Sequence, residues 1–339
     1  MRLIRLLIVI LAVLVGGVAA GGWYMLAVPG RSWSGPAPPL TDDERDLAGR
    51  LERHVRAIAS EPHNTRHPAA LEAAANYIER EVASFGYRVG RQEFNVDGIN
   101  VRNIDATLEP AAGPPQAVGS LVIGAHYDSF RDAPGATDNG SGVAALIELA
   151  RKLAGLKPSQ SRVRFVFFVN EEPPYFQTPN MGSWRYAEAL SERQEKVRGL
   201  IALETLGTFS SEPGSQRYPL LLRALSFPDR ADFVAFVGML GSRTFLHDVL
   251  GSFRRHAKVP SIGGVGPWII PGIGWSDHWS FAQFGFPALM LTDTALFRSP
   301  DYHRRSDTPD KVNYEMLARI TGALAQVVVE LADRQQTGN

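Results

Sequence analysis

Acidic and histidine side chains follow directly after apolar stretches of this sequence, and this pattern can build a metal site. His126 and Asp128 follow the apolar run at 121–123, and residues two apart in an extended segment point to the same side. The spacing suits a metal-ligating histidine and a carboxylate that orients it. Asp138 comes next, in the glycine-rich loop 135–142 that precedes an apolar helix. A lone His-x-Asp pair is more often a surface hydrogen-bonded pair, so this interpretation depends on the rest of the chain.

Three further stretches add potential ligands. They are the apolar run 163–169 followed by Glu171 and Glu172, the apolar run 200–203 followed by Glu204, and the polar loop 300–310 with His303. Adjacent residues at the end of a strand point to opposite sides, so one glutamate can face a metal and the other the substrate. Open α/β sheets bind their ligands at the carboxyl ends of the strands, so this repetition favours one shared site.

In this order, the motifs resemble those of the co-catalytic di-zinc exopeptidase family, which includes bacterial leucyl aminopeptidases, glutamate carboxypeptidases and glutaminyl cyclases. The motifs are His-x-Asp, the loop GATDNGSG, the Glu-Glu pair, the acid after an apolar strand and the later histidine. The resemblance covers about residues 41–331, including the segments 181–187 and 276–281. It implies an α/β fold: a three-layer αβα sandwich with a mixed, mostly parallel central sheet.

The resemblance also implies a role for each residue. One zinc ion would be held by His126, Asp138 and Glu204, and a second by Asp138, Glu172 and His303. Asp138 would therefore bridge the two ions, Glu171 would be the general base, and Asp128 would orient His126. The family usually has aspartate at the position of Glu204.

The chemistry explains why these residue types are needed. Zinc binds imidazole nitrogen and carboxylate oxygen, and a catalytic site leaves a position for water or substrate. Two zinc ions bridged by one carboxylate can hold a hydroxide and stabilise the tetrahedral intermediate of amide hydrolysis. Glu171 would take the proton of the water and pass it to the leaving amine, and Tyr302 is a candidate donor to the carbonyl oxygen. We therefore expect a zinc metallopeptidase with two zinc ions, most simply an aminopeptidase acting on peptides.

Two other functions remain open. One is aminoacyl transfer of the glutaminyl cyclase kind with one working zinc, because Glu204 alters a ligand of one metal. The other is a non-catalytic binding protein with the same fold, although retention of every ligand and of Glu171 argues against it.

Composition excludes several other classes. The chain has no cysteine, which excludes thiol catalysis and a disulfide framework. It has 35 basic and 35 acidic residues, so there is no surplus of positive charge for nucleic acid. The absence of Gly-x-Ser-x-Gly weakens a serine hydrolase, and the absence of His-Glu-x-x-His excludes that helix-borne zinc motif.

The amino-terminal segment predicts a membrane helix. Residues 6–30 carry no charged side chain, and about 25 residues at about 1.5 Å each can cross a hydrocarbon core of about 30 Å. Arg2 and Arg5 precede this run, as in a signal anchor or a secretory signal peptide. Trp23 and Tyr24 suit an interfacial position and favour the anchor. The catalytic domain is therefore expected outside the cytoplasm, on the periplasmic or extracellular face, and secreted if the segment is cleaved.

We expect three segments: a signal anchor or signal peptide at 1–30, a linker at 31–40 and a catalytic domain at 41–335. The linker is rich in Pro, Gly and Ser, so we expect it to stand away from the membrane without packing. The first residues of the domain, Thr41 to Glu44, match a capping box and predict that a helix begins there.

The remaining elements follow from apolar periodicity. Helices are expected at 69–85, 143–153, 242–256 and 313–332, and strands at 88–96, 100–108, 232–239 and 288–292. The sheet should begin with antiparallel pairing and become parallel from residue 120 onward. We interpret 263–274 as a loop. The family resemblance implies that such loops form walls of the substrate cleft, so Trp268 or Trp275 could line a pocket.

The other histidines match no ligand position of the family. Surface or hydrogen-bonding roles are expected for His54, His63 and His67. His247 and His256 lie on the predicted helix 242–256 and are not expected to be ligands. Asp277 and His278 follow the family pattern more closely, and we interpret them as residues that support the site or fix a loop.

Overall fold

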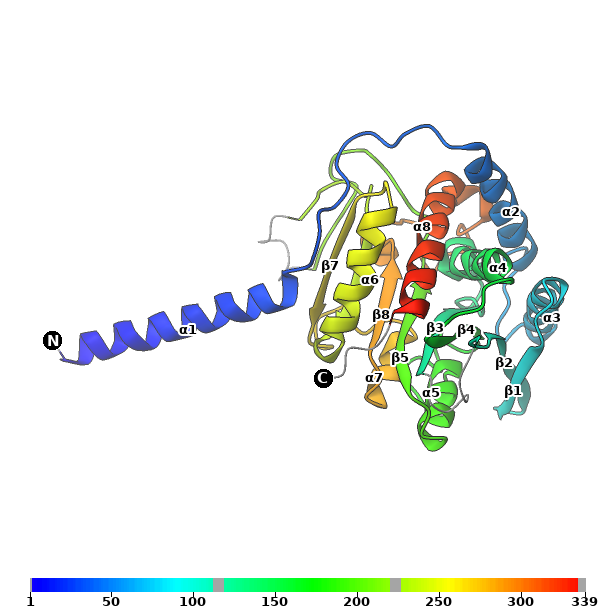
Figure 1. Cartoon of the computed structure of the whole chain (residues 1–339), viewed down its shortest axis with the longest axis horizontal. Helices are drawn as coiled ribbons and strands as arrows, with labels where there is room; N and C mark the ends of the chain where they lie inside the picture. Colours follow the sequence, from blue (N-terminus) through cyan, green and yellow to red (C-terminus); the bar gives the residue numbers. More distant parts are fainter. Residues whose placement is uncertain (1, 112–118, 220–226, 335–339) are drawn as a thin grey trace.

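The computed structural model describes residues 2–111, 119–219 and 227–334 (Figure 1). Its helices in these ranges are α1 (Arg2–Leu26), α2 (Asp42–Ile58), α3 (Pro68–Ser84), α4 (Ser141–Leu153), α5 (Gly182–Glu192), α6 (Arg243–His256), α7 (His278–Gln283) and α8 (Tyr314–Asp333). Its strands are β1 (Val89–Val96), β2 (Ile99–Leu108), β3 (Gly119–His126), β4 (Ser161–Phe168), β5 (Val197–Glu204), β6 (Val234–Met239), β7 (Ser261–Gly266) and β8 (Ala288–Thr292). The expected end of the catalytic domain at residue 335 lies outside the described residues.

The strands form one mixed sheet in the order β1-β2-β4-β3-β5-β8-β6-β7. Antiparallel pairing joins β1, β2 and β4, whereas β4, β3, β5 and β8 are parallel. The expected mixed, mostly parallel sheet is confirmed. The four helices and four strands expected from apolar periodicity are also confirmed, and their ends lie within two residues of the predicted ones.

The predicted parallel pairing from residue 120 onward is wrong for one strand of the second half of the sheet. β6 runs antiparallel to β8, and only β7 resumes parallel pairing with β6. Because β8 is parallel to β5, β6 begins at the edge of the sheet where β5 ends. The chain therefore enters β6 without the crossover that a parallel strand needs.

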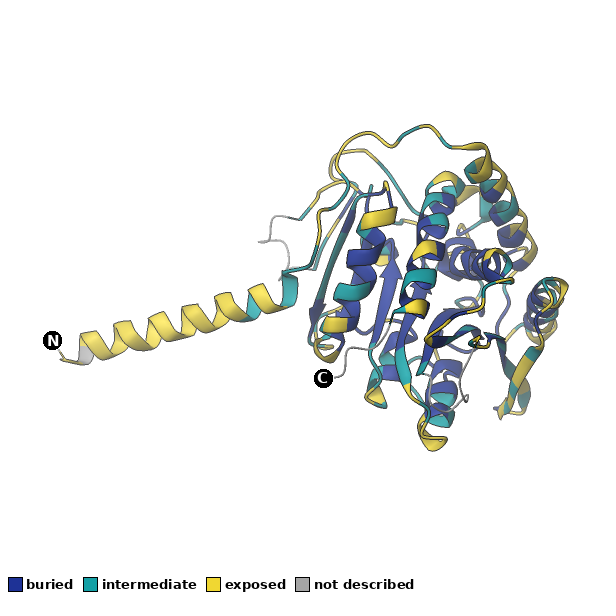
Figure 2. Ribbon diagram, in the orientation of Figure 1, coloured by how far each residue is buried: buried dark blue, intermediate teal, exposed yellow. Residues whose placement is uncertain are grey.

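Helices cover both faces of the sheet. α2, α3, α4, α6 and α8 lie on one side, α5 and α7 lie on the other, and a separate apolar cluster fills each side. Buried residues gather in the sheet and on the helix faces turned toward it (Figure 2). β3 is buried along almost its whole length, as a continuous apolar run predicts for a central parallel strand. The three-layer αβα architecture is thus confirmed.

The first helix of the domain, α2, begins with the predicted capping box. The backbone N–H of Glu44 donates to Thr41 Oγ1 at 3.2 Å, and the N–H of Thr41 donates to Glu44 Oε2 at 2.8 Å. The helix then buries Leu47, Leu51 and Val55 on one face, which fixes its orientation against the core.

The stretch 263–274, which we interpreted as a loop, contributes part of the edge strand β7. Glycines give this strand a loop-like sequence, but two of them admit close neighbours. A Cβ at Gly263 would meet Leu250 of α6 at 2.6 Å, and a Cβ at Gly264 would meet the carbonyl oxygen of Met25 at 2.8 Å. β7 is therefore pressed between α6 on one face and the end of α1 on the other, which explains its composition.

The linker 31–40 packs on the domain, contrary to the expectation that it stands free. The backbone N–H of Ser261 donates to Ser32 Oγ at 2.8 Å, and the guanidinium of Arg319 donates to the carbonyl of Pro38. Proline removes backbone donors but leaves carbonyl acceptors, and the domain supplies side chains that reach them.

α1 projects away from the domain and leaves it beside β7 (Figure 1). Within it, Ile4–Leu26 is 23 residues long with a mean hydropathy of 2.5, long and apolar enough to cross a membrane. A secretory signal sequence has the same properties, so length and composition alone do not distinguish the two.

Candidate metal centre

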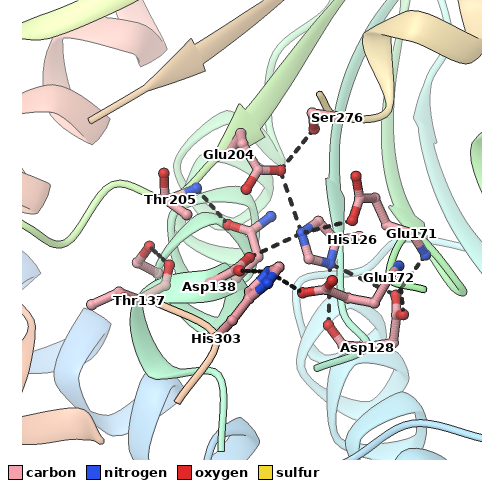
Figure 3. A network of polar contacts seen from close by, with 12 residues as sticks. His126, Asp128, Thr137, Asp138, Glu171, Glu172, Glu204, Thr205, Ser276 and His303 are labelled. Carbon is pink, nitrogen blue, oxygen red and sulfur yellow. Dashed lines mark hydrogen bonds and ion pairs between the residues drawn. The ribbon is translucent and has the colours of Figure 1, made fainter. Parts of the chain in front are cut away.

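Side chains from five parts of the fold converge at the carboxyl edge of the sheet (Figure 3). His126 ends β3, Asp138 lies in the turn η1 (Ala136–Gly140) before α4, Glu171 and Glu172 follow β4, Glu204 ends β5, and His303 lies between β8 and α8. The potential ligand atoms form two groups, His126–Asp138–Glu204 and Asp138–Glu172–His303. These are the two sets that the sequence resemblance implies, and the structure brings each of them together.

The distances within each group suit a shared cation. His126 Nε2 lies 3.4 Å from Asp138 Oδ1 and 3.3 Å from Glu204 Oε2. His303 Nε2 lies 3.0 Å from Asp138 Oδ2 and 3.2 Å from Glu172 Oε1. Two ligand atoms bound to one tetrahedral zinc at about 2.0–2.1 Å lie about 3.3 Å apart. Asp138 turns one oxygen toward each group, as a bridging carboxylate would.

Burial and charge give an independent test of the fit. The acids Asp128, Asp138, Glu171, Glu172 and Glu204 are each at most 7% exposed. Among the described residues, the only ion-pair partners of these acids are His126 and His303. Moreover His126 Nε2, Asp138 Oδ2 and Glu172 Oε1 are buried without a hydrogen bond to a described residue. Buried charge and unpaired polar atoms are costly, and bound cations would satisfy both, so the residues fit a metal centre.

The same crowding shifts the pKa values. Burial, and then the charge of Asp138, raises the pKa of Glu172 to about 8. Burial lowers the pKa of His303, but the close carboxylates of Asp138 and Glu172 outweigh it and raise the pKa to about 10. Burial raises the pKa of Asp138, whereas the two close imidazoles outweigh it and hold the pKa below its usual value. The centre therefore binds protons that a cation would displace.

Asp128 lies beside His126 as expected, with its Oδ1 3.7 Å from His126 Nδ1. The hydrogen bond of that nitrogen is to the backbone carbonyl of Asp128, at 3.1 Å. The carboxylate itself accepts the backbone N–H groups of Glu171 and Glu172 at 3.0 and 3.1 Å. One aspartate thus links the histidine to the glutamate pair.

Left-handed backbone occurs beside the ligands. Asn170, Thr205 and His303 have φ values of 61°, 46° and 60°, which non-glycine residues rarely adopt. Asn170 turns the chain just before the glutamate pair, so both carboxylates enter the site rather than pointing to opposite faces. Such strain persists only where the surrounding contacts hold it, as they do at functional sites.

The roles of two supporting residues were not predicted from the sequence. Asp307 accepts the backbone N–H groups of Thr137 and Asp138 at 2.9 and 3.1 Å, so it holds the loop of the bridging carboxylate. Ser276 donates its hydroxyl to Glu204 Oε2 at 2.7 Å. Both residues are distant in sequence from the ligands they support, and only the folded chain reveals the pairing.

Asn139 could have been recognised, because it lies inside the GATDNGSG loop. Its side-chain amide donates to the carbonyl of Leu203 at 2.8 Å, and its Oδ1 accepts the N–H of Thr205 at 3.0 Å. These bonds fasten the loop of Asp138 to the two neighbours of Glu204.

His303 is held between two aromatic rings. Its ring centroid lies 3.9 Å from that of Phe130 and 3.9 Å from that of Tyr302, and both pairs are stacked. The imidazole side chain is 25% exposed, so this side of the centre is open to solvent. Tyr302 therefore lies at the site, and its role as a hydrogen-bond donor stays a prediction.

The remaining histidines, tryptophans and aspartate that the sequence singled out lie outside the two ligand groups. His54 is hydrogen-bonded to Tyr77 and Glu148, far in sequence from any ligand, and His278 Nε2 bonds to the carbonyl of Ile273 at 2.7 Å. Trp275 lines an apolar chamber next to the centre, whereas Trp268 does not line it. Asp277 is fully buried near Glu171, and burial raises its pKa to about 7.

Comparisons with known proteins identify a family match and similar folds. The model of peptidase family M28 matches residues 103–228 and 268–328. The protein YfbL of Escherichia coli (strain K12) is 37% identical over 281 residues, which cover 80% of this chain and 84% of that protein. The zinc aminopeptidase BSAP from Bacillus subtilis superposes with a TM-score of 0.68 at 15% identity, over 89% of this chain and 98% of that one. Glutaminyl cyclase from Fimbriiglobus ruber gives a TM-score of 0.61 at 17% identity, over 89% and 98%.

Proposed function

The chain belongs to peptidase family M28, and on that premise we propose that it is a membrane-tethered aminopeptidase with two zinc ions. Membership of the family makes it a zinc metallopeptidase. The observation that supports the finer proposal is the pair of ligand groups that share Asp138. Two complete groups are what an enzyme with two cations needs.

The proposed ligands are those of the two groups: His126, Asp138 and Glu204 for one zinc, and Asp138, Glu172 and His303 for the other. When bound, zinc at this site would polarise the carbonyl of the substrate and make a water molecule more acidic. The chain must hold the ligands in place, which Asp128, Asp307 and Asn139 do through the hydrogen bonds described above.

Glu171 is the proposed general base. Its Oε2 lies 3.9 Å from His126 Nε2, inside the centre but outside both ligand groups. Burial raises the pKa of Glu171 well above its usual value, so the carboxylate can accept a proton and keep it until the leaving amine takes it. The hydrogen bond from its backbone to Asp128 fixes its distance from the ligands.

A free amino terminus suits the charge of the centre. The five buried acids carry more negative charge than two zinc ions would neutralise, so the loaded site would still attract a positively charged group next to the bond to be cleaved. This surplus supports an aminopeptidase over an endopeptidase, whose substrates carry no charge there.

A second candidate is aminoacyl transfer of the glutaminyl cyclase kind. Two observations favour it. Glu204 replaces the aspartate that is usual in the di-zinc exopeptidase family, and the fold is similar to that of a glutaminyl cyclase. The complete second group of ligands favours the peptidase. The retained Glu171 speaks against a third candidate, a binding protein without catalysis.

The proposed location follows from α1. We infer that residues 1–30 anchor the chain, that 31–40 connect the anchor to the domain, and that the catalytic domain begins at Thr41 outside the cytoplasm. The apolar length of α1 and the interfacial type of Trp23 and Tyr24 support an anchor.

The test compares leucyl amide with its N-acetyl form, using the purified full-length protein with and without a chelator. We expect cleavage of the free amine only, loss of activity with the chelator and recovery on addition of zinc. Equal cleavage of the acetylated substrate would contradict an aminopeptidase. Cyclisation of amino-terminal glutamine without peptide cleavage would favour the second candidate.

A further inference from the structure

An apolar chamber of about 630 Å³ adjoins the metal centre. Glu204 and Tyr302 of the metal centre line it, and much of the remaining wall is apolar, with Val237, Ile262 and Met290 among its side chains. Pockets of about 300–1,000 Å³ hold ligands much larger than one small side chain. The chamber is thus large enough for more than one apolar group of a substrate whose amide bond lies at the centre.

The helix α1 forms part of the same wall. Its lining residues are Val18, Gly22, Met25 and Leu26, which recur at helical spacing and therefore share one face. Burial along α1 agrees with this contact: the helix is exposed along most of its length and becomes partly buried only in its last turns (Figure 2). The face that borders the chamber is the face that turns toward the domain.

The end of α1 is fixed to the domain rather than loosely attached. Arg243 Nε donates to the carbonyl of Tyr24 at 2.8 Å, and its guanidinium carbon lies 4.7 Å from the centre of the Tyr24 ring. Arg254 Nη1 donates to the carbonyl of Pro29 at 2.7 Å. Both arginines belong to α6, so one helix of the domain holds the exit of the anchor at two points.

The depth of these residues places the chamber next to the membrane. Trp23 and Tyr24 are 69% and 43% exposed, as expected of aromatic side chains at headgroup level. Val18 lies five residues earlier, about 7 Å closer to the bilayer centre at about 1.5 Å per residue. The α1 side of the chamber therefore extends from Leu26 near the membrane surface to Val18 within the apolar layer, where Val18 is 77% exposed.

The rim of the chamber is also apolar and accessible. Leu296 and Trp275 line it and are 43% and 41% exposed. Trp268 and Ile269 precede its lining residue Ile270 and are 64% and 74% exposed. An apolar rim beside a membrane helix favours entry of a ligand that is already partitioned into the membrane surface.

We propose that α1 is part of the substrate site, and that the chamber binds the apolar side chains flanking the cleaved bond of peptides held at the membrane surface. This inference rests on the proposed peptidase function and names its substrate class. The anchor then does more than tether the enzyme, because it completes the wall that selects the substrate.

The test places a large side chain in the chamber by a single substitution in α1. A Cβ at Gly22 meets nothing within 4 Å, so Gly22→Phe is sterically allowed and directs a ring toward the chamber. Gly17 also has nothing within 4 Å and does not line the chamber, so Gly17→Phe is the matched control. Both full-length variants and the wild type are assayed in phospholipid nanodiscs with leucyl-leucyl-leucine and with alanyl-alanine.

We expect Gly22→Phe to lower the ratio of kcat/KM for leucyl-leucyl-leucine over alanyl-alanine by at least about tenfold, mainly through KM. Gly17→Phe should leave the ratio as in the wild type, and zinc content should be equal in all three proteins. An unchanged ratio in Gly22→Phe, or an equal loss for both peptides, would overturn the inference while leaving the peptidase function intact.

Two further outcomes are decisive. If the zinc-loaded wild type cleaves neither peptide, the proposed function fails and this inference fails with it. The intact mass of the protein extracted from membranes must also include residues 1–30. A mass that lacks them would overturn the role of α1 and leave the proposed reaction unaffected.

Discussion

The metal centre and the apolar chamber share Glu204 but are built on different principles. In the centre, buried charges are held by hydrogen bonds from distant parts of the chain, such as those of Asp128 and Asp307. In the chamber, apolar side chains of β6, β7, β8 and α1 meet mainly by packing. The comparison teaches that the reaction depends on a rigid polar framework, whereas the choice of substrate depends on how the anchor and the sheet edge fit together.

The strongest test of the polar framework removes Asp138, the residue that belongs to both ligand groups. Asp138→Ala takes one ligand from both groups, so we expect both zinc ions to be lost and activity to fall to background. Asp232→Ala, an acid outside the centre, is the control. Metal content by mass spectrometry and hydrolysis of leucyl amide measure the two effects. Retention of one tightly bound zinc together with activity would show that Asp138 does not bridge.

The proposed base separates chemistry from metal binding. Glu171→Gln keeps the size of the side chain but cannot accept a proton, so kcat should fall by about 10²–10⁴-fold. Zinc content should stay close to that of the wild type, because Glu171 is outside both ligand groups. Glu212→Gln, an exposed substitution, should change neither quantity. Substantial turnover by Glu171→Gln would rule out this residue as the base.

The crowded acids predict how zinc affinity depends on pH. The pKa of Glu172 is raised to about 8 and that of His303 to about 10, so both carry protons at pH 7 when no cation competes. Zinc binding must displace these protons, so affinity should rise with pH between 6 and 8. The expected slope is about tenfold per pH unit for each proton displaced. Calorimetry in buffers of different ionisation enthalpy counts the released protons, and a pH-independent affinity would contradict the assignment of these ligands.

A milder change tests the hydrogen bonds that hold the framework. Asp307→Asn can donate where the carboxylate accepted, so it loosens the loop of Asp138 without removing a ligand. Zinc affinity should fall by about 10–100-fold, as for other groups that orient metal ligands. Asp310→Asn in the same loop, where Asp310 is exposed, should have little effect. Equal affinities of the two variants would mean that the clamp is dispensable.

The smallest effect is expected in the chamber. Ile262→Ala removes part of its wall on β7, and should lower kcat/KM for leucyl-leucyl-leucine by roughly threefold to tenfold. Zinc content should not change, which distinguishes this region from the centre. Leu240→Ala removes a side chain of equal size that is 42% exposed and does not line the chamber. A similar loss in both variants would argue against a specific role of the chamber wall.

The same comparison explains what could be predicted from the sequence. The metal centre could be predicted because its residues lie at strand ends and in one glycine-rich loop. There the local sequence pattern indicates both the secondary-structure element and the position of the residue in it. His126 and Glu204 end β3 and β5, so their neighbourhood follows from parallel pairing. The three-layer fold was predictable for the same reason, since its apolar runs and helical periodicity are local properties.

The chamber could not be predicted from the sequence, because its walls come from contacts that leave no periodic signal. β7 resembles a loop in sequence, and its glycines are explained only by the close approach of α6 and α1. The packing of the linker on the domain, and the clamp by Asp307, likewise join residues that are distant in sequence. Trp268 or Trp275 was expected at a pocket on grounds of the family, and of the two only Trp275 lines it, but the part of α1 in that pocket was not foreseen.

The most direct test of the central claim is the number of zinc ions bound to the purified full-length protein and to His303→Ala. His303 belongs to only one of the two ligand groups, so its removal should leave the other group complete. We predict two zinc ions per chain in the wild type and one in the variant. A single zinc ion in the wild type, or two in His303→Ala, would contradict a centre built from two groups that share Asp138.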